Sequence, residues 1–261
     1  MSLATCTLGR SNLTVTVLGF GTAPLGDLYA RLDDATAIAT VEAALAAGIT
    51  LLDTSPHYGN GLAEHRCGTA LRRHRRDGLV LSTKGGRVMD PRQPPAAPAR
   101  SDVTAPGFAG GLPHKASFDY SYDGAMRSFE QSLLRLGTDR IDVLLIHDVD
   151  VWTHGPDAIE ARFREAMDGA YRALADLRDQ KVIKAIGVGI NEADMCERFA
   201  RAGDFDCMLL AGRYSLLEQP ALESFLPLAQ EKNIGVMLGG VFNSGILATG
   251  AVPGARYNYA P

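Results

Sequence analysis

Four polar side chains in this sequence have the types and spacing that acid–base catalysis needs. Asp53 and Tyr58 lie five residues apart in DTSPHYG, Lys84 lies in LSTKGGR and His147 lies in LLIHDVD. A phenol titrates near pH ~10 and is a poor base at neutral pH, but a nearby ammonium favours the phenolate and lowers that pKa. The set therefore predicts proton transfer at a carbonyl or hydroxyl carbon, with Tyr58 as the residue that gives or takes the proton.

The three other side chains would support this phenol. Asp53 would pair with Lys84 and hold it beside Tyr58, while His147 would hydrogen-bond the substrate oxygen and orient it. A single lysine or histidine in such a place is more often a structural residue. The prediction rests on joint placement, because each of the four lies at or just beyond the end of an apolar run of strand length.

Six apolar runs of this kind are expected to be strands, with a seventh before them. They cover residues 49–53, 79–84, 141–147, 182–190, 207–211 and 234–239, and residues 15–19 form the expected first strand. The run at 141–147 is apolar almost throughout, which is typical of a parallel strand covered on both faces.

Amphipathic helical segments separate these runs. The first is capped by Asp33 or Asp34, carries its apolar residues on one face and ends at Gly48. Five more are expected over residues 62–74, 122–136, 164–180, 192–202 and 220–232. Strand–helix alternation predicts a parallel (β/α) barrel, in which catalytic residues gather at the carboxyl ends of the strands.

We expect residues 1–261 to form one α/β domain, a (β/α)8 TIM barrel that lacks its eighth unit. The 46% of hydrophobic residues is ample for one sizeable core. The pattern supplies seven strands, and the residues after Leu247 make no eighth apolar strand. Because the first and eighth strands pair to close a barrel, we expect a gap there, and a working polypeptide longer than this sequence.

Bulk composition argues against several classes of partner. A net charge of −4 gives no reason to expect nucleic acid or an anionic membrane surface. The sequence has no apolar run of membrane-spanning length and no secretory signal at its start. Its four cysteines are scattered, which favours a reduced, cytoplasmic protein, and no spacing of Cys and His indicates a metal site.

These motifs resemble those of the aldo-keto reductase family. With GFGTAPLG, GVGINE, RYSLLEQ and GGVFNSGIL, the resemblance covers nearly the whole chain. It implies a (β/α)8 barrel that binds NAD(P) across the strand ends, and an Asp-Tyr-Lys-His tetrad at Asp53, Tyr58, Lys84 and His147. RYSLLEQ and FNSGIL are most similar to the aldose 1-dehydrogenase branch, which includes fucose, galactose and threo-aldose dehydrogenases and pyridoxal 4-dehydrogenase.

The same resemblance implies a set of cofactor contacts. Asn191 would hold the nicotinamide carboxamide, although it also suits an N-cap for the helix that follows. Tyr214 is either a contact or a packing residue, and the glycine-rich loop after the seventh strand is either a pyrophosphate cradle or an ordinary turn. The remaining candidates are Gly21 and Thr22 near the ribose, and Gly240, Phe242, Asn243, Ser244 and Gly245 in the loop.

Two positions depart from the family pattern. Ala211 stands where many relatives have a glutamine, and Gly239 stands where many have a tyrosine that stacks on the nicotinamide. Stacking would then come from Phe242 or Trp152. The branch resemblance favours NAD over NADP, although the residues that distinguish them in the family follow the eighth strand.

The expected function is that of an NAD(P)-dependent oxidoreductase. Its substrate would be a small molecule, an aldose, a pyridoxal-like cyclic hemiacetal or an aldehyde, with a hemiacetal oxidised to a lactone. The loops at residues 87–121 and 149–163 would close the pocket, where Trp152 either stacks on a sugar face or is a buried structural residue. The alternatives are a Schiff-base barrel aldolase that uses Lys84 and a non-catalytic, cofactor-binding regulatory relative.

Overall fold

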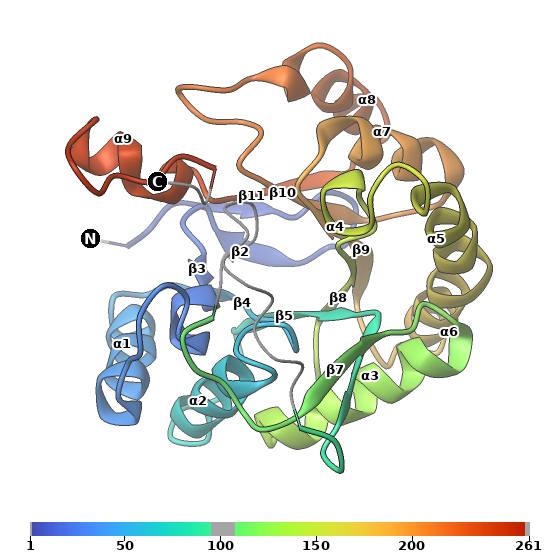
Figure 1. The fold of residues 1–261 in the computed structure, drawn as a ribbon. Coiled ribbons are helices and arrows are strands. Elements are labelled where there is room, and N and C mark those ends of the chain that lie inside the picture. The colour runs from blue at the N-terminus through green and yellow to red at the C-terminus, as the bar shows by residue number, and fades with distance from the viewer. Residues whose placement is uncertain (1, 95–107, 259–261) are drawn as a thin grey trace.

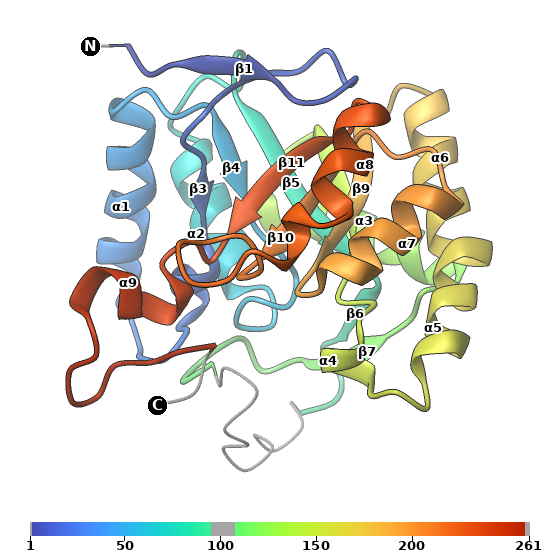
Figure 2. The same cartoon turned by 90° about the horizontal axis from the view of Figure 1, so that it is seen from above.

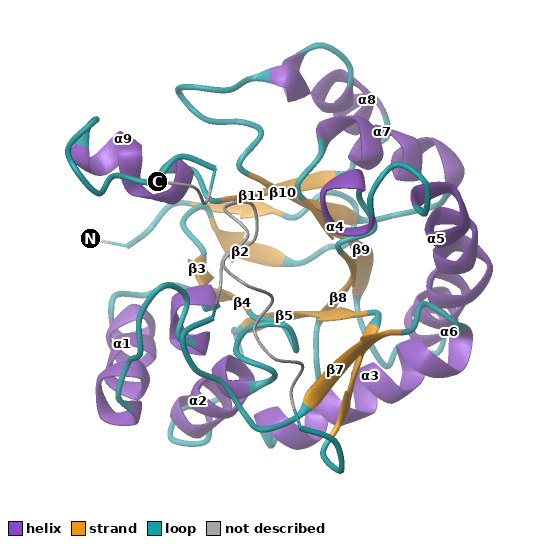
Figure 3. Cartoon of the chain, viewed as in Figure 1, coloured by secondary structure: helices purple, strands orange, loops and turns teal. Residues whose placement is uncertain are grey.

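A parallel sheet of seven strands, curled into a nearly closed barrel, forms the centre of the molecule. The structure is a computed structural model that describes residues 2–94 and 108–258. Helices surround the sheet (Figures 1 and 3). From one edge to the other, the strands are β3 (Phe20–Gly21), β4 (Leu51–Asp53), β5 (Val80–Gly85), β8 (Val143–His147), β9 (Ala185–Ile190), β10 (Cys207–Ala211) and β11 (Gly235–Gly239).

The helices follow the strands as the alternating pattern predicts. They are α1 (Asp34–Ala46), α2 (Leu62–Leu71), α3 (Tyr122–Leu136), α5 (Ile159–Glu165), α6 (Tyr171–Asp179), α7 (Ala193–Ala202) and α8 (Phe225–Glu231), with short helices α4 (Val151–His154) and α9 (Ile246–Thr249). Asp33 caps α1 as expected, accepting a hydrogen bond from the Thr36 amide at 2.8 Å. A π-helical turn, Ala166–Ala170, joins α5 to α6, so this helical segment begins earlier than predicted.

The prediction for the first strand is wrong. β2 (Thr14–Thr16), which overlaps the apolar run at residues 15–19, pairs antiparallel with β1 (Thr5–Thr7), and the first barrel strand is β3 instead. Leu13 and Val15 of this hairpin are buried against side chains that fill the barrel, including Leu51 and Val143. Val15 therefore belongs to a cover over the barrel floor, which a strand-length count alone does not distinguish from a barrel strand.

The hairpin approaches the barrel closely at a glycine. Gly9 has a φ of +54°, and a Cβ there would lie 2.2 Å from the Gly235 amide nitrogen and 2.4 Å from the Asp206 carbonyl oxygen. No side chain fits in that space, so a glycine is needed where the hairpin meets the amino end of β11. Figure 2 shows β1 at one end of the barrel and α4 and β7 at the other.

Strands β3 and β11 form the two edges of the sheet. Within residues 2–94 and 108–258 no strand pairs with both, which confirms the expected gap between the first and seventh strands. The described part of the chain also contains no helix long and apolar enough to cross a membrane. The gap lies away from β4, β5 and β8, the strands that were predicted to carry the catalytic residues.

We predict that the hairpin contributes substantially to stability. Leu13 is 6% exposed in the floor of the barrel, so Leu13→Ala should lower the free energy of unfolding by about 2–5 kcal/mol in urea denaturation. Leu134 is 82% exposed, and Leu134→Ala should change it by less than ~0.5 kcal/mol. Equal effects of the two substitutions would show that the hairpin is not part of the cooperative core.

Candidate active site

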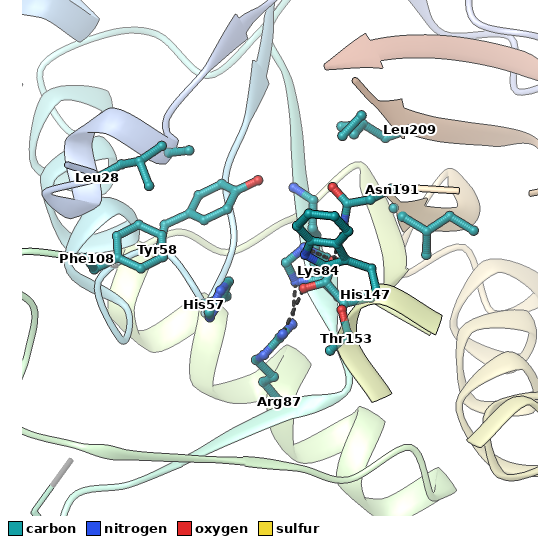
Figure 4. Close-up of a pocket in the computed structure, with 16 residues that line it drawn as sticks. Leu28, His57, Tyr58, Lys84, Arg87, Phe108, His147, Thr153, Asn191 and Leu209 are labelled. Atoms are coloured by element: carbon teal, nitrogen blue, oxygen red, sulfur yellow. Dashed lines mark hydrogen bonds and ion pairs between the residues drawn. The ribbon is translucent and has the colours of Figure 1, made fainter. Parts of the chain in front are cut away.

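The four predicted catalytic residues meet at the carboxyl end of the barrel. Asp53 ends β4, Lys84 lies one residue before the end of β5, and His147 ends β8. Tyr58 lies in the turn after β4, and its ring points to the same cavity as Lys84 and His147 (Figure 4). The cavity has a volume of about 320 Å³, which suits a small molecule.

A buried ion pair holds the lysine in place. The Lys84 Nζ donates to Asp53 Oδ2 at 2.6 Å and to the Thr54 carbonyl at 2.7 Å, and the side chain is 1% exposed. Asp53 also accepts from the Ser82 hydroxyl at 2.8 Å. Burial lowers the pKa of Lys84, but Asp53 and Tyr58 outweigh this and raise it, so the amine stays charged.

The predicted direction of the Tyr58 pKa is wrong. The Lys84 ammonium lies 5.0 Å from the centroid of the Tyr58 ring and does lower the pKa of the phenol. Burial is the larger effect and raises this pKa, as do the carboxylates of Asp53 and Asp148, so the result lies above the usual 10.0. The sequence shows the ammonium but not its neutralisation by Asp53 or the burial of the ring.

His147 is held from its Nδ1 side. That nitrogen lies 3.1 Å from the Ser55 hydroxyl and 2.9 Å from Arg87 Nη1, while Nε2 lies 3.4 Å from Asp148 Oδ1. Burial, then Arg87 and Lys84, lower the pKa of His147 well below its usual 6.5. The imidazole is therefore neutral near pH 7.

Sequence reasoning missed Arg87, Asp148 and His57, which also line this cavity. Arg87 begins β6 (Arg87–Asp90), which pairs with β7 (Lys115–Phe118) inside what was expected to be an irregular loop. All three lie within the motifs that carry the tetrad. His57 precedes Tyr58, Asp148 follows His147, and Arg87 lies three residues after Lys84. Extending the strand-end comparison to those neighbours would have identified them.

The two long connections both contribute to the cavity wall. Phe108 lies against His57, with ring centroids 5.2 Å apart in an edge-on arrangement. Trp152 and Thr153 of α4 also line the wall. Trp152 is 37% exposed and borders two cavities, so the alternative of a buried structural tryptophan is wrong. Residues 95–107 of the first connection lie outside the described residues.

A second cavity adjoins the first and shares Tyr58, Trp152 and Asn191 with it. Five of the expected cofactor contacts line this second cavity: Gly21, Asn191, Gly240, Asn243 and Ser244. Asn191 Nδ2 donates to Asp150 Oδ2 at 3.2 Å, and its amide oxygen points toward the cavity (Figure 4). Helix α7 has Glu192 at its N-cap position and no side-chain cap, so the capping role considered for Asn191 is wrong.

An unpartnered polar atom at the second cavity fits a bound dinucleotide. Asn243 is 3% exposed, its Oδ1 accepts from the Asn258 amide at 2.8 Å, and its Nδ2 has no partner among the described residues. Thr22 Oγ1 is also buried and unpartnered among the described residues, but Thr22 lines neither cavity. Buried donors without acceptors are rare in proteins, and phosphate oxygens would satisfy them. Gly240, at a φ of +62°, presents bare backbone to the same cavity.

Three other candidates do not line either of these cavities. Phe242 is 60% exposed on the surface, so it does not supply the expected stacking surface in this arrangement. Tyr214 packs against the main hydrophobic core, which is the structural alternative considered for it. Gly245 occupies the N-cap position of α9, at a φ of +105°.

The chain has relatives among characterised proteins. The Aldo/keto reductase family model matches residues 17–260. The chain is 45% identical to pyridoxal 4-dehydrogenase of Microbacterium luteolum over 97% of the chain and 75% of that protein. It is 39% identical to D-threo-aldose 1-dehydrogenase of a Pseudomonas species over 91% and 69%. An aldo-keto reductase structure from Bacillus halodurans, in its holo form, superposes with a TM-score of 0.73 and 25% identity, over 97% and 71%.

Removing the Tyr58 hydroxyl should abolish most turnover. Tyr58→Phe should lower kcat by on the order of 10²-fold or more and leave nucleotide binding nearly unchanged, because a general acid–base group is lost. Tyr171→Phe is the matched control, since that hydroxyl accepts from the Asp204 amide at 2.9 Å and lies outside both cavities. A near-normal kcat for Tyr58→Phe would refute the assignment.

Proposed function

This chain belongs to the aldo/keto reductase family, and from that membership we propose that the protein oxidises a small cyclic hemiacetal to a lactone with NAD⁺. It is an NAD(P)-dependent oxidoreductase, like the dehydrogenases it resembles. The observation that carries the finer proposal is that Tyr58, Lys84 and His147 line one cavity, with Asp53 paired to Lys84, in a chain 45% identical to a pyridoxal 4-dehydrogenase. Pyridoxal and aldoses are the proposed substrates.

Tyr58 is the proposed proton-transfer residue. In the oxidative direction its phenolate accepts the hydroxyl proton of the hemiacetal, while the ammonium of Lys84 stabilises the negative charge and Asp53 holds that ammonium. His147 donates a hydrogen bond to the same substrate oxygen and orients it. The nicotinamide ring, when bound, supplies the hydride acceptor. In the reductive direction the neutral phenol returns the proton, and its raised pKa keeps the phenol protonated at neutral pH.

The residues of the second cavity would hold the nucleotide. Asn191 offers its amide oxygen to the carboxamide, and Asn243 Nδ2 and the backbone at Gly240 suit the pyrophosphate. Among the described residues that line this cavity, Arg213 alone is basic. Its Nη1 donates to Glu218 at 3.0 Å and to Asn258 at 3.1 Å. The proposal of NAD rather than NADP rests on the resemblance to the aldose 1-dehydrogenase branch.

The cavity walls suit a flat ring that carries hydroxyl groups. Leu28, Phe108 and Trp152 supply apolar and aromatic surface. His57 faces the same space, and burial, then Arg87 and Lys84, lower the pKa of His57 well below 6.5, so the ring is neutral and able to hydrogen-bond a hydroxyl. Pyridoxal in its cyclic form and a pyranose or furanose sugar share this combination of a ring with hydroxyls beside the reacting carbon.

The Schiff-base alternative finds no support at Lys84. An aldolase lysine must present a free amine to the substrate carbonyl. Lys84 instead donates to Asp53 and to the Thr54 carbonyl, and its raised pKa keeps it protonated. The non-catalytic alternative is not supported either, because all four acid–base residues are present and in place.

We propose a cytoplasmic location. Cys67, Cys196 and Cys207 are buried free thiols, and burial raises the pKa of each above its usual 9.0, which makes them unreactive structural residues. Thiols of this kind are usual in a reducing compartment.

The formation of NADH or NADPH tests the substrate and the cofactor together. Pyridoxal and a panel of aldoses should each be tried with NAD⁺ and NADP⁺, and we expect kcat/KM to be about 10-fold or more higher with NAD⁺, a difference of ~1.4 kcal/mol. Pyridoxine is the matched control, since it has the same ring but no hemiacetal. Turnover of pyridoxine or simple aldehydes alone would refute the hemiacetal proposal, and a preference for NADP⁺ would refute the cofactor proposal.

The pH dependence of oxidation should report on Lys84. Because the pKa of Tyr58 is raised, little phenolate exists at neutral pH, and kcat/KM for oxidation should increase with pH into the alkaline range. Lys84→Met removes the charge that lowers this pKa, so the rise should move to still higher pH.

Lys184→Met is the matched control, because Lys184 is 58% exposed and pairs with Asp142 at 3.0 Å. It should leave the profile unchanged. An unmoved profile in Lys84→Met, in protein shown to be folded by circular dichroism, would mean that Lys84 does not set the pKa of Tyr58.

A further inference from the structure

Arg87 lies beside the tetrad and contacts His147 directly. It is 5% exposed, and its Nη1 lies 2.9 Å from His147 Nδ1 (Figure 4). Its Nη2 donates to Asp148 Oδ2 at 2.7 Å. The guanidinium also lies 4.3 Å from the centroid of the Phe118 ring, across the β6–β7 hairpin. Arg87 thus joins a hairpin beside the barrel to the imidazole that faces the substrate.

The contact with Arg87 settles which nitrogen of His147 carries the proton. A guanidinium has N–H donors and no acceptor, and it stays charged at any pH a protein experiences. At 2.9 Å, His147 Nδ1 must accept from it, so the proton of the neutral imidazole lies on Nε2. Ser55 agrees, because its hydroxyl oxygen accepts from the His57 amide at 3.0 Å and its proton is available to Nδ1 at 3.1 Å.

We propose that Arg87 is a positioning residue that keeps His147 as the neutral Nε2–H tautomer. In that form the ring donates one hydrogen bond to the substrate oxygen and takes up no second proton. A second proton would have to bind Nδ1 and would point at the N–H of Arg87. Tyr58 is then the one tetrad residue that exchanges a proton with the substrate.

The charges around His147 act in the same direction. The groups that face it are Lys84 from β5, Arg87 from β6, His57 and Tyr58 from the turn after β4, and the adjacent Asp148. Burial and the two cations lower the pKa of His147. Asp148 is the one anion among them, and its Oδ2 is taken by Arg87.

Asp148 does not compete strongly for the Nε2 proton. Its Oδ1 lies 3.4 Å from His147 Nε2, which is long for a hydrogen bond, so a substrate oxygen at normal distance would displace it.

The backbone of Arg87 and of His147 is also held by hydrogen bonds from residues outside the cavity. The Ser128 hydroxyl donates to the Arg87 carbonyl at 2.9 Å, and the Tyr120 hydroxyl donates to the His147 carbonyl at 2.7 Å.

Nitrogen NMR of the unmodified protein tests the tautomer without any use of the proposed function. Protein labelled with ¹⁵N-histidine contains six histidines, and loss of one set of signals in His147→Asn identifies those of His147. We expect a protonated Nε2 and an unprotonated Nδ1 from about pH 5.5 to 8. A proton on Nδ1, or titration near the ordinary pKa of ~6.5, overturns the proposal.

Variants test whether Arg87 is the cause. In Arg87→Met, His147 should populate both tautomers and titrate nearer ~6.5, and kcat/KM should decrease by on the order of 10- to 100-fold. Arg87→Lys should restore the tautomer in part, because one ammonium can still donate to Nδ1. A folded Arg87→Met protein with an unchanged tautomer and titration overturns the proposal, whatever its activity.

Arg198→Met is the matched control. Arg198 also pairs with a carboxylate, Glu160 at 2.6 Å, and lies 3.8 Å from the centroid of the Phe163 ring, but it is outside the cavity. Its substitution should leave the His147 signals unchanged. If Arg87→Met does not fold, the unmodified protein and Arg87→Lys still decide the matter. A protein with the expected spectrum but no dehydrogenase activity would refute the proposed function and leave the role of Arg87 standing.

Discussion

The site depends on the buried ion pair between Lys84 and Asp53. Two charges in a protein interior are costly unless they are close together and otherwise hydrogen-bonded, and this pair meets both conditions at 2.6 Å, with Ser82 and the Thr54 carbonyl as further partners. The pair joins β4 to β5 and fixes where positive charge lies beside Tyr58. Packing of the surrounding barrel offsets the free energy of burying these two charges. Its apolar interior and outer helices hold the strand ends in register.

Burial of the ring, with a smaller effect from this pair, explains why the phenol of Tyr58 is not already deprotonated. Burial raises the pKa of Tyr58, and Asp53 immobilises the ammonium but also offsets its field, so Tyr58 keeps its proton at neutral pH. A paired lysine therefore gives a site that works in both directions, with proton donation favoured near neutrality and proton uptake favoured in alkali. On the other side of the cavity, Arg87 and Asp148 form a second ion pair, which surrounds His147 with fixed charge.

The sequence predicted those parts of the molecule that depend on local pattern and on chain order. The strand at residues 207–211 and the helix at 122–136 were predicted with their observed bounds, and the tetrad followed from reading the ends of three strands. Properties set by tertiary packing were missed. Val15 is apolar because it covers the barrel floor, and the pKa of Tyr58 depends on burial that no motif records. Arg87 was overlooked because a hairpin, rather than a barrel strand, carries it.

The β1–β2 hairpin at the amino end of the barrel has a consequence for proton exchange with solvent. Leu8, Leu13 and Val15 fill the amino end of the barrel and pack against Leu51 and Leu145, so apolar side chains lie between the Lys84–Asp53 pair and solvent on that side. The carboxyl-end cavity, which admits the substrate, offers a route to bulk water. A proton that Tyr58 gains or loses can pass through that opening, where a bound substrate and nucleotide would lie between the phenol and the solvent while the reaction proceeds.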